Sequence, residues 1–225
     1  VLAVRAIWDT WEHGAPLEFR GEFYRHTLMT PFFTPSADDV AGFGPPKVFL
    51  AGVGSLMTEV AGEVCDGFLC HGFTTEKYLR EVTIPALARG RAKAGKTMEG
   101  FEIVGPSFVV TGNSEEEMAA AIAGTRQQIA FYGSTPAYRN VLDAHGWGGL
   151  QDELNSLSKM GKWVDMGNLI TDEILNTFAV VGEPETIAPE LHRRYGDVIQ
   201  RISFYAPYKS DPERCATVPE ALKSA

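Results

Sequence analysis

Two glycines and a serine follow the first apolar run of the chain, in the order Gly52-Val53-Gly54-Ser55. The run Val48–Ala51 before them is typical of a buried strand, and the amphipathic segment Leu56–Val64 after them is typical of a helix. Glycines at the start of a helix let its free N–H groups and positive dipole end approach an anion closely. The pattern indicates a phosphate-binding turn, with Ser55 adding a hydroxyl, or an ordinary strand-to-helix turn in which Ser55 is the N-cap.

A histidine ends the second apolar run, Gly67–His71. Catalytic groups of barrel enzymes lie where strands end, and an imidazole of ordinary pKa, about 6.5, can donate or accept a proton near neutral pH. A single histidine at a strand end can also be a hydrogen-bonded structural residue or line a pocket. His71 is therefore the candidate catalytic residue, with these two alternatives beside it.

Two aromatic residues further along the chain, Tyr132 and Trp163, could stack on a ring or on an apolar substrate. Aromatic side chains in such a segment can equally serve helix packing. The chain shows no nucleophile with a paired base and no set of ligands with the spacing of a metal site, so we expect no metal. Gly148-Gly149 lacks the further glycine and the strand–turn–helix context of a dinucleotide-binding motif.

The elements that must position these residues alternate between strands and helices. Four apolar runs predict strands, and helical patterns separate them, which favours an α/β fold with a parallel sheet. The clearest helices are Tyr78–Ala94, which ends before Gly95, and a helix from the capping box Ser114–Glu117 to about Tyr132. The four predicted strands are Val48–Ala51, Gly67–His71, Phe101–Val110 and Ile199–Tyr205.

A long connection separates the third and fourth predicted strands, too long for one crossover. Its part 131–168 is rich in glycine and aromatic residues and is interpreted as a helical insertion before the last strand. Insertions after barrel strands build the pocket at the carboxyl ends of the strands, or they pack on the rim. We divide the chain into a barrel domain, 1–207, and a loosely attached tail, 208–225.

The composition restricts the kind of protein. The chain has 225 residues, 44% of them hydrophobic, and a formal net charge of −9, which argues against nucleic-acid binding. No apolar run is long enough to span a membrane, and no signal peptide is visible. The three cysteines, Cys65, Cys70 and Cys215, form no spaced framework and indicate reduced thiols. We expect a cytoplasmic protein without nucleic-acid or membrane partners.

Five blocks of sequence, in order, resemble the bacterial luciferase-like monooxygenase superfamily, most closely its coenzyme F420-dependent oxidoreductases. The order and spacing of the blocks are more specific than any one glycine motif. The blocks are Ala6–Trp11 with Gly21–Tyr24, Ala51–Gly62, Asp66–Phe73, Ile129–Tyr138 and Phe178–Pro184.

The resemblance implies a (β/α)8 TIM barrel, of which this chain corresponds to the C-terminal half, strands 5–8. It implies hydride transfer between coenzyme F420 and a small organic substrate. Alternatives are an FMN-dependent monooxygenase and a truncated, non-catalytic ligand-binding remnant. In the family this turn binds the cofactor phosphate, so the implied contacts are Ala51, Gly52, Val53, Gly54 and Ser55, and the insertion places Tyr132 and Trp163 on the substrate side.

Two further expectations follow. A half barrel exposes sheet edges and an apolar face, so we expect pairing with missing segments or with another copy, as in a homo-oligomer. The long anionic tail of coenzyme F420 would favour cations near the mouth of the glycine turn. The candidates are Lys47, Lys77 and Arg80, each of which can also be an ordinary surface charge.

Overall fold

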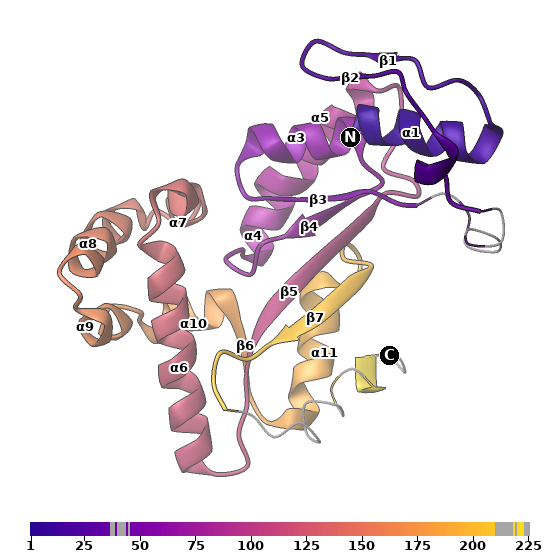
Figure 1. The fold of residues 1–225 in the computed structure, drawn as a ribbon. Helices are drawn as coiled ribbons and strands as arrows, with labels where there is room; N and C mark the ends of the chain where they lie inside the picture. The colour runs from indigo at the N-terminus through magenta and orange to yellow at the C-terminus, as the bar shows by residue number, and fades with distance from the viewer. Residues whose placement is uncertain (37–38, 40–43, 45, 210–217, 219, 223–225) are drawn as a thin grey trace.

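The computed structural model describes residues 1–36, 39, 44, 46–209, 218 and 220–222, and its centre is a parallel sheet (Figure 1). Its main strands are β3 (Phe49–Gly52), β4 (Gly67–Cys70), β5 (Glu102–Val110) and β7 (Arg201–Tyr205). They pair in sequential order, and every pair is parallel. The four predicted strands and their arrangement are therefore confirmed.

A fifth strand, β6 (Ala179–Val181), was not predicted, and it pairs in parallel with the carboxyl end of β5. Its three residues are too few to produce a periodic signal. The sequence predicts helices at 171–177 and at 183–195, with no strand between them. The strand forms because β5 is long enough to pair with β4 near its start and with β6 near its end.

Alternate residues of the sheet point to two different faces. On the helix-covered face, Phe68, Ile103 and Phe204 pack into an apolar core with the helices. On the other side, here called the open face, register places Ala51, Leu69 and Val104 in one row. The side chain of Leu69 is 38% exposed although it is apolar. The helices therefore bury much of one face of the sheet, and the middle of the other face is accessible in the described structure.

Three helical segments cover the helix-covered face. The first is α3 (Ser55–Val64), between β3 and β4. The second begins with α4 (Glu76–Tyr78), continues through the π-helical turn η2 (Leu79–Thr83) and ends with α5 (Ile84–Lys93). The third is α11 (Pro184–Tyr195), which leads to β7. These are the helices expected between the strands, and Gly95, at φ 68°, follows the second as predicted.

The connection from β5 to β6 consists of helices that extend away from the sheet (Figure 1). The long helix α6 starts at the predicted cap, where Ser114 Oγ accepts a hydrogen bond from Glu117 N. The short helix α9 was not predicted. In order, the helices are α6 (Glu115–Gly133), η3 (Pro136–Tyr138), α7 (Arg139–Asp143), α8 (Gly148–Lys159), α9 (Trp163–Asn168) and α10 (Asp172–Phe178).

Before the sheet, the chain forms α1 (Leu2–His13), the two-stranded ribbon of β1 (Phe19–Arg20) and β2 (Arg25–His26), and η1 (Pro31–Phe33). Arg5 ties α1 to the start of the sheet through its ion pair with Asp66. At the other end, most of the predicted tail, 208–225, lies outside the described residues. Of its described part, Val218 is buried against the apolar core of the helix-covered face.

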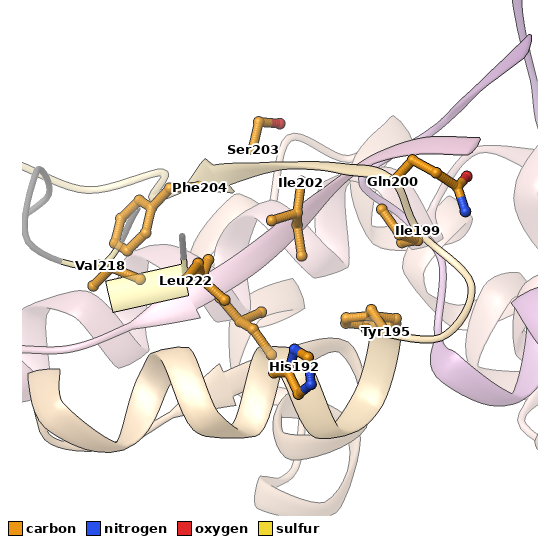
Figure 2. Close-up of a pocket in the computed structure, with 11 residues that line it drawn as sticks. His192, Tyr195, Ile199, Gln200, Ile202, Ser203, Phe204, Val218 and Leu222 are labelled. Carbon is orange, nitrogen blue, oxygen red and sulfur yellow. The ribbon is translucent and has the colours of Figure 1, made fainter. Parts of the chain in front are cut away.

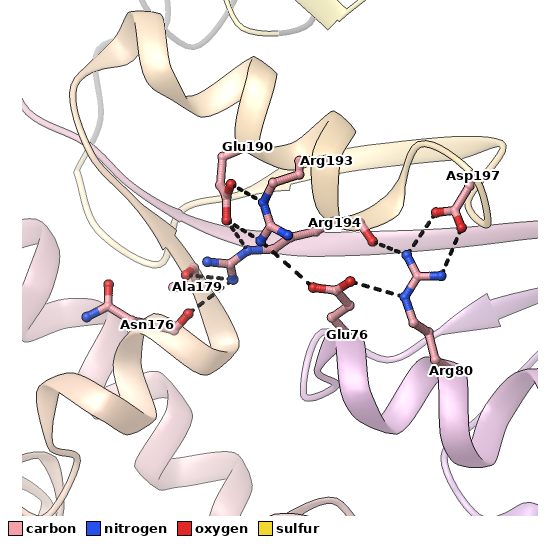
Figure 3. Close-up of polar contacts among 8 residues, drawn as sticks. All are labelled: Glu76, Arg80, Asn176, Ala179, Glu190, Arg193, Arg194 and Asp197. Carbon is pink, nitrogen blue, oxygen red and sulfur yellow. Dashed lines mark hydrogen bonds and ion pairs between the residues drawn. The ribbon is translucent and has the colours of Figure 1, made fainter.

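A network of ion pairs joins α11 to the segment that follows β4 (Figure 3). Arg80 contacts Asp197 with two nitrogens, at 2.8 and 2.9 Å, and also contacts Glu76. Glu190 accepts hydrogen bonds from Arg193 and Arg194. These arginines lower the pKa of the Glu190 carboxyl to about 2, with the Arg193 hydrogen bond as the largest cause.

The helices α3 and α5 cross with their backbones in contact, because each contributes a glycine. A Cβ on Gly62 would lie 2.2 Å from Leu87 O, and one on Gly90 would lie 1.9 Å from Glu59 O. Neither obstacle is a flexible side chain, so a side chain at either position forces the helices apart. This contact fixes the height of α3, and therefore of the glycine turn, above the sheet.

Replacing Gly90 with alanine should separate α3 from α5 and destabilise the fold. We expect Gly90→Ala to lower the free energy of unfolding by about 1–3 kcal/mol, the usual cost of overpacking. The control is Gly149→Ala in α8, where a Cβ meets no atom within 4 Å; it should gain up to about 1 kcal/mol from helix propensity. Urea denaturation measures both, and equal effects of the two variants would contradict the close contact.

The Glu190 network should make stability depend on acid. Because the folded-state pKa, about 2, lies below the ordinary value of 4.5, the stabilisation is complete above pH 4.5 and is lost as the pH falls toward 2. We expect Glu190→Gln to be less stable than the wild type at pH 6, with a smaller difference at pH 3.5. Urea midpoints at both pH values measure this. Glu153→Gln, which alters an exposed carboxylate of α8, is the control. A wild-type advantage that stays constant with pH would contradict the assignment.

Candidate functional site

The glycine turn joins β3 to α3 at the carboxyl edge of the sheet. The N-cap of α3 is Gly54, at φ −73° and ψ 147°, and no side chain caps the helix. The alternative of Ser55 as N-cap is therefore wrong, because Ser55 is already the first helical residue and is exposed to solvent. Thr58, which is buried, closes the first turn by donating from N and Oγ1 to Gly54 O.

The start of α3 carries no negative charge of its own. Its first turn contains no acidic residue, whereas α6 has Glu115, Glu116 and Glu117 at the corresponding positions. No hydrogen-bond acceptor is found among the described residues for the N–H groups of Ser55 and Leu56. The positive end of the α3 dipole is thus uncompensated and can stabilise an anion.

Gly54 leaves room at this point. A Cβ built on it meets no atom within 4 Å, and its φ is ordinary for any residue. Packing and the φ angle therefore do not require a glycine here, in contrast to Gly62 and Gly90, although glycine is a favoured N-cap residue. An anion lying against the turn would be a second reason for a glycine, and the turn fits a cofactor phosphate. Gly52 differs, because its Cβ would lie 3.1 Å from Met57 Cγ.

His71 follows the last residue of β4, as the sequence predicted for the end of this strand. Its Nδ1 accepts a hydrogen bond from Phe73 N at 3.1 Å, and its Nε2 lies 3.4 Å from the Tyr138 hydroxyl. With Nδ1 occupied as an acceptor, the neutral ring carries its proton on Nε2. Burial lowers the pKa of His71. At neutral pH the ring is therefore an uncharged hydrogen-bond donor through Nε2.

Aromatic rings from two elements contact His71, and a third element adds Tyr205 beside them. The ring of Tyr132 (α6) meets it edge to face and that of Tyr138 (η3) is tilted against it, each with centroids 4.7 Å away. Tyr205, the last residue of β7, stacks on Phe108 at 4.8 Å and shares a 3.0 Å hydrogen bond with the Tyr132 hydroxyl. We name His71, Tyr132, Tyr138 and Tyr205 the aromatic cluster.

The structure brings some of the predicted residues together and leaves one apart. Gly52, Val53 and His71 line the same small cleft, and Tyr78 joins its two sides by donating its hydroxyl proton to Val53 O. Tyr132 lies beside His71. Trp163, however, contacts Phe131 and is 51% exposed. No contact joins Trp163 to His71 or to the turn in the described structure. Trp163 contacts Phe131, whereas His71 contacts Tyr132, and these neighbouring residues of α6 point in different directions.

Three tyrosines of the site, at positions 78, 138 and 205, were not predicted. Tyr78 was counted only as the start of a helix, and Tyr205 only as the end of a strand. The position of Tyr205 offered a signal: it ends a parallel strand, as His71 does, and strand ends share one edge of the sheet. Tyr138 gave none, since only the folded connection brings it to His71.

The expected cluster of cations at the turn is not formed. Lys47 precedes β3 and pairs with Glu102 at the amino edge of the sheet, one strand length away from the turn. Arg80 is held by Glu76 and Asp197. The prediction for Lys47 is wrong because a residue before a parallel strand lies at the edge opposite to the residue after it. Arg80 follows β4, but two carboxylates of the chain itself bind its guanidinium. For Lys77, no ion pair is found among the described residues.

A second hollow lies on the helix-covered face, between α11 and β7 (Figure 2). Tyr195, Ile202 and Phe204 line it together with Val218 and Leu222, while Ser203 points to the opposite side of β7. It lies between α11 and β7, away from the glycine turn, so we do not assign the site there. In the described ranges, no three His, Cys, Asp or Glu side chains gather as metal ligands, and no helix has the length and apolar character needed to cross a membrane.

The hydrogen bond to His71 Nδ1 leads to a prediction on stability. Phe73 is buried, so His71→Ala would leave its N–H without an acceptor, at a cost of about 1–3 kcal/mol. In His71→Asn the side-chain oxygen can replace Nδ1, and we expect less than half of that loss. Chemical denaturation measures both variants. Equal losses for alanine and asparagine would show that the ring is held by packing alone.

Relatives of this chain span more than its own length. The uncharacterized protein Rv1360 of Mycobacterium tuberculosis is 52% identical over 202 residues, which cover 90% of this chain and 58% of that protein. The 5,10-methylenetetrahydromethanopterin reductase of Methanopyrus kandleri is 23% identical over 219 residues, covering 95% of this chain and 58% of the reductase. The chain thus spans somewhat more than half the length of the curated relatives it matches.

Solved structures confirm the fold. The coenzyme F420-dependent tetrahydromethanopterin reductase of Methanopyrus kandleri superposes with a TM-score of 0.74 at 16% identity, over 98% of this chain and 61% of the reductase. The EDTA monooxygenase of Chelativorans sp. BNC1 gives 0.57 at 16% identity, over 93% of this chain and 52% of that one. The open parallel sheet corresponds to part of their barrel. The sequence profile of the luciferase-like monooxygenases matches residues 1–201, and the chain belongs to this family.

Proposed function

We propose that this chain is the cofactor-phosphate and substrate part of an oxidoreductase that transfers a hydride between coenzyme F420 and a small organic substrate. The family supports an oxidoreductase or monooxygenase. The F420-dependent reductase, which is similar in both sequence and fold, supports this cofactor. The cation cluster that would favour its anionic tail is not formed by Lys47 and Arg80. The choice of coenzyme F420 therefore depends on the relatives.

The single observation that carries the proposal is the start of α3. An uncompensated helix N-terminus and the open space at Gly54 occur together at the carboxyl edge of a parallel sheet. Barrel enzymes hold their ligands at this edge. The turn Ala51–Ser55 would hold the cofactor phosphate through its backbone N–H groups. The bound deazaflavin would supply the hydride chemistry.

The aromatic cluster would form the substrate side. His71 lies in the same small cleft as Gly52 and Val53 of the turn, and the ring of Tyr132 contacts the ring of His71. The apolar rings would exclude water, and His71 would present an uncharged ring whose Nε2–H faces the Tyr138 hydroxyl. We further propose a second copy of this chain, or segments outside it, as the cover of the open face.

The second candidate is an FMN-dependent monooxygenase, which the similarity to the EDTA monooxygenase favours. Both cofactors carry a phosphate, so the turn cannot separate them. Fluorescence titration with coenzyme F420 and with FMN, combined with oxygen uptake, tests the choice. Tight binding of FMN with oxygen consumption, and no response to coenzyme F420, would replace the first proposal by the second.

Substitution of Gly54 tests the phosphate site directly. A Cβ at this position contacts nothing, so we expect Gly54→Val to fold, with a loss of only about 1 kcal/mol because valine is a poorer N-cap than glycine. Its side chain would occupy the space proposed for the phosphate and weaken cofactor binding at least tenfold, or by about 1.4 kcal/mol. Fluorescence titration measures the affinity and urea denaturation measures the stability. The control Gly149→Ala should change the affinity for coenzyme F420 and the affinity for FMN by no more than twofold. An unchanged cofactor affinity in Gly54→Val would refute the assignment.

A further inference from the structure

The hydroxyl groups of Tyr132 and Tyr205 differ from those of the other tyrosines around the sheet. Tyr78 donates to Val53 O, and Tyr208 donates to Val109 O while it accepts from Thr111 N. The hydroxyls of Tyr78 and Tyr208 are therefore hydrogen-bonded to backbone groups. For Tyr132 and Tyr205, the hydrogen-bond partner found in the described structure is the other hydroxyl of the pair, 3.0 Å away.

The hydroxyl pair has one proton that its internal hydrogen bond does not use. Each hydroxyl carries one proton and can accept two hydrogen bonds. Only one of the two protons lies between the oxygens, whichever tyrosine donates it. The hydroxyl that accepts within the pair still holds its own proton, and both tyrosines are only half-buried. The pair therefore has one O–H donor that is not used between its two oxygens and is available to a ligand.

The position of the pair matches that of a substrate group. Tyr205 ends β7 at the carboxyl edge, on the face that carries Phe108, and Tyr132 reaches it from α6. The Tyr132 ring contacts the ring of His71, whose cleft includes Gly52 of the turn. A molecule held by the pair would thus lie beside His71 and near the proposed cofactor.

The surroundings of the pair are uncharged. Burial and the neighbouring Tyr132 hydroxyl raise the pKa of Tyr205 to about 12, with burial the larger cause and no charged group among the causes. Burial alone lowers the pKa of His71. Tyr205 therefore stays protonated and His71 stays neutral at pH 7. No Asp, Glu, Lys or Arg of the described residues contributes to either pKa shift, which favours a neutral acceptor as the partner.

We propose that the Tyr132–Tyr205 hydroxyl pair binds the carbonyl or hydroxyl oxygen of a small neutral molecule and so selects the substrate class of this site. That this molecule is a substrate depends on the proposed hydride transfer, whereas binding of its oxygen by the pair does not depend on that proposal. The interaction is a hydrogen bond, and no proton is transferred. Tyr132 and Tyr205 are specificity-determining residues, and Tyr138 positions the His71 ring beside them.

Two probes of nearly equal shape test the pair without any cofactor. Cyclohexanone presents an oxygen where methylenecyclohexane presents a CH2 group. Binding is followed by NMR shifts of 13C-labelled tyrosine rings in the wild type, in Tyr132→Phe, in Tyr205→Phe, in the double variant Tyr132→Phe/Tyr205→Phe and in the control Tyr24→Phe. Tyr24 is an exposed tyrosine between β1 and β2.

We expect the wild type and Tyr24→Phe to prefer the ketone by about two- to tenfold, the effect of one hydrogen bond. The double variant Tyr132→Phe/Tyr205→Phe should lose this preference while its affinity for the hydrocarbon stays within twofold. Each single variant keeps one hydroxyl and its proton, and should therefore retain part of the preference. A ketone preference that survives unchanged in the double variant would overturn the proposal. So would a wild type that does not distinguish the probes.

A separate titration with coenzyme F420 keeps the two proposals distinguishable. If the wild type prefers the ketone but does not bind coenzyme F420, the oxygen site stands and the proposed cofactor fails. If coenzyme F420 binds with equal affinity to the wild type and to both phenylalanine variants, but the ketone preference is absent, the cofactor assignment stands and the oxygen site fails.

Discussion

The parallel direction of β3, β4, β5 and β7 constrains everything else in this molecule, because it sends all strand ends to the same edge of the sheet. Residues that follow strands, such as the glycine turn and His71, must then be neighbours even though many residues separate them. Residues that precede strands gather at the other edge. The two edges have different chemistry for this reason, and the helices are arranged accordingly.

The amino edge carries a group of ion pairs, because Lys47 and Arg201 both pair with Glu102 there, on the open face. Around the proposed site at the carboxyl edge, the groups described above are the backbone N–H groups at the start of α3 and the rings of the aromatic cluster. The carboxylates of this edge that lie in the first turn of α6 belong to another helix start. The proposed anion-binding turn and the proposed oxygen-binding pair are therefore both built from uncharged groups.

The rigidity of this edge comes from contacts on the helix-covered face. Gly62 and Gly90 let α3 and α5 touch through their backbones, which holds the first turn of α3 in place. The arginine network of α11 holds the segment after β4 from the other side, through Arg80 and Asp197 (Figure 3). Both devices act at a distance from the site, and both limit how far the turn and His71 can move apart.

The sequence alone was sufficient for the elements with strong local signals. Apolar runs predicted the four main strands, the capping box predicted the start of α6, and the glycine turn was located between β3 and α3. Such signals are local, since they depend on periodicity and on residues a few positions apart. The three-residue strand β6 and the helix α9 were missed, because neither is long enough to show a period.

The tertiary structure decided which side chains lie next to each other. The sequence could name His71 and Tyr132, but not the Tyr132–Tyr205 hydrogen bond, which joins residues 73 positions apart. It could name Lys47 and Arg80 as candidates, but not that Glu102 and Asp197 would bind them. It could not show that Trp163 turns away from His71. These outcomes depend on long-range packing of side chains, and no pattern in the local sequence encodes that packing.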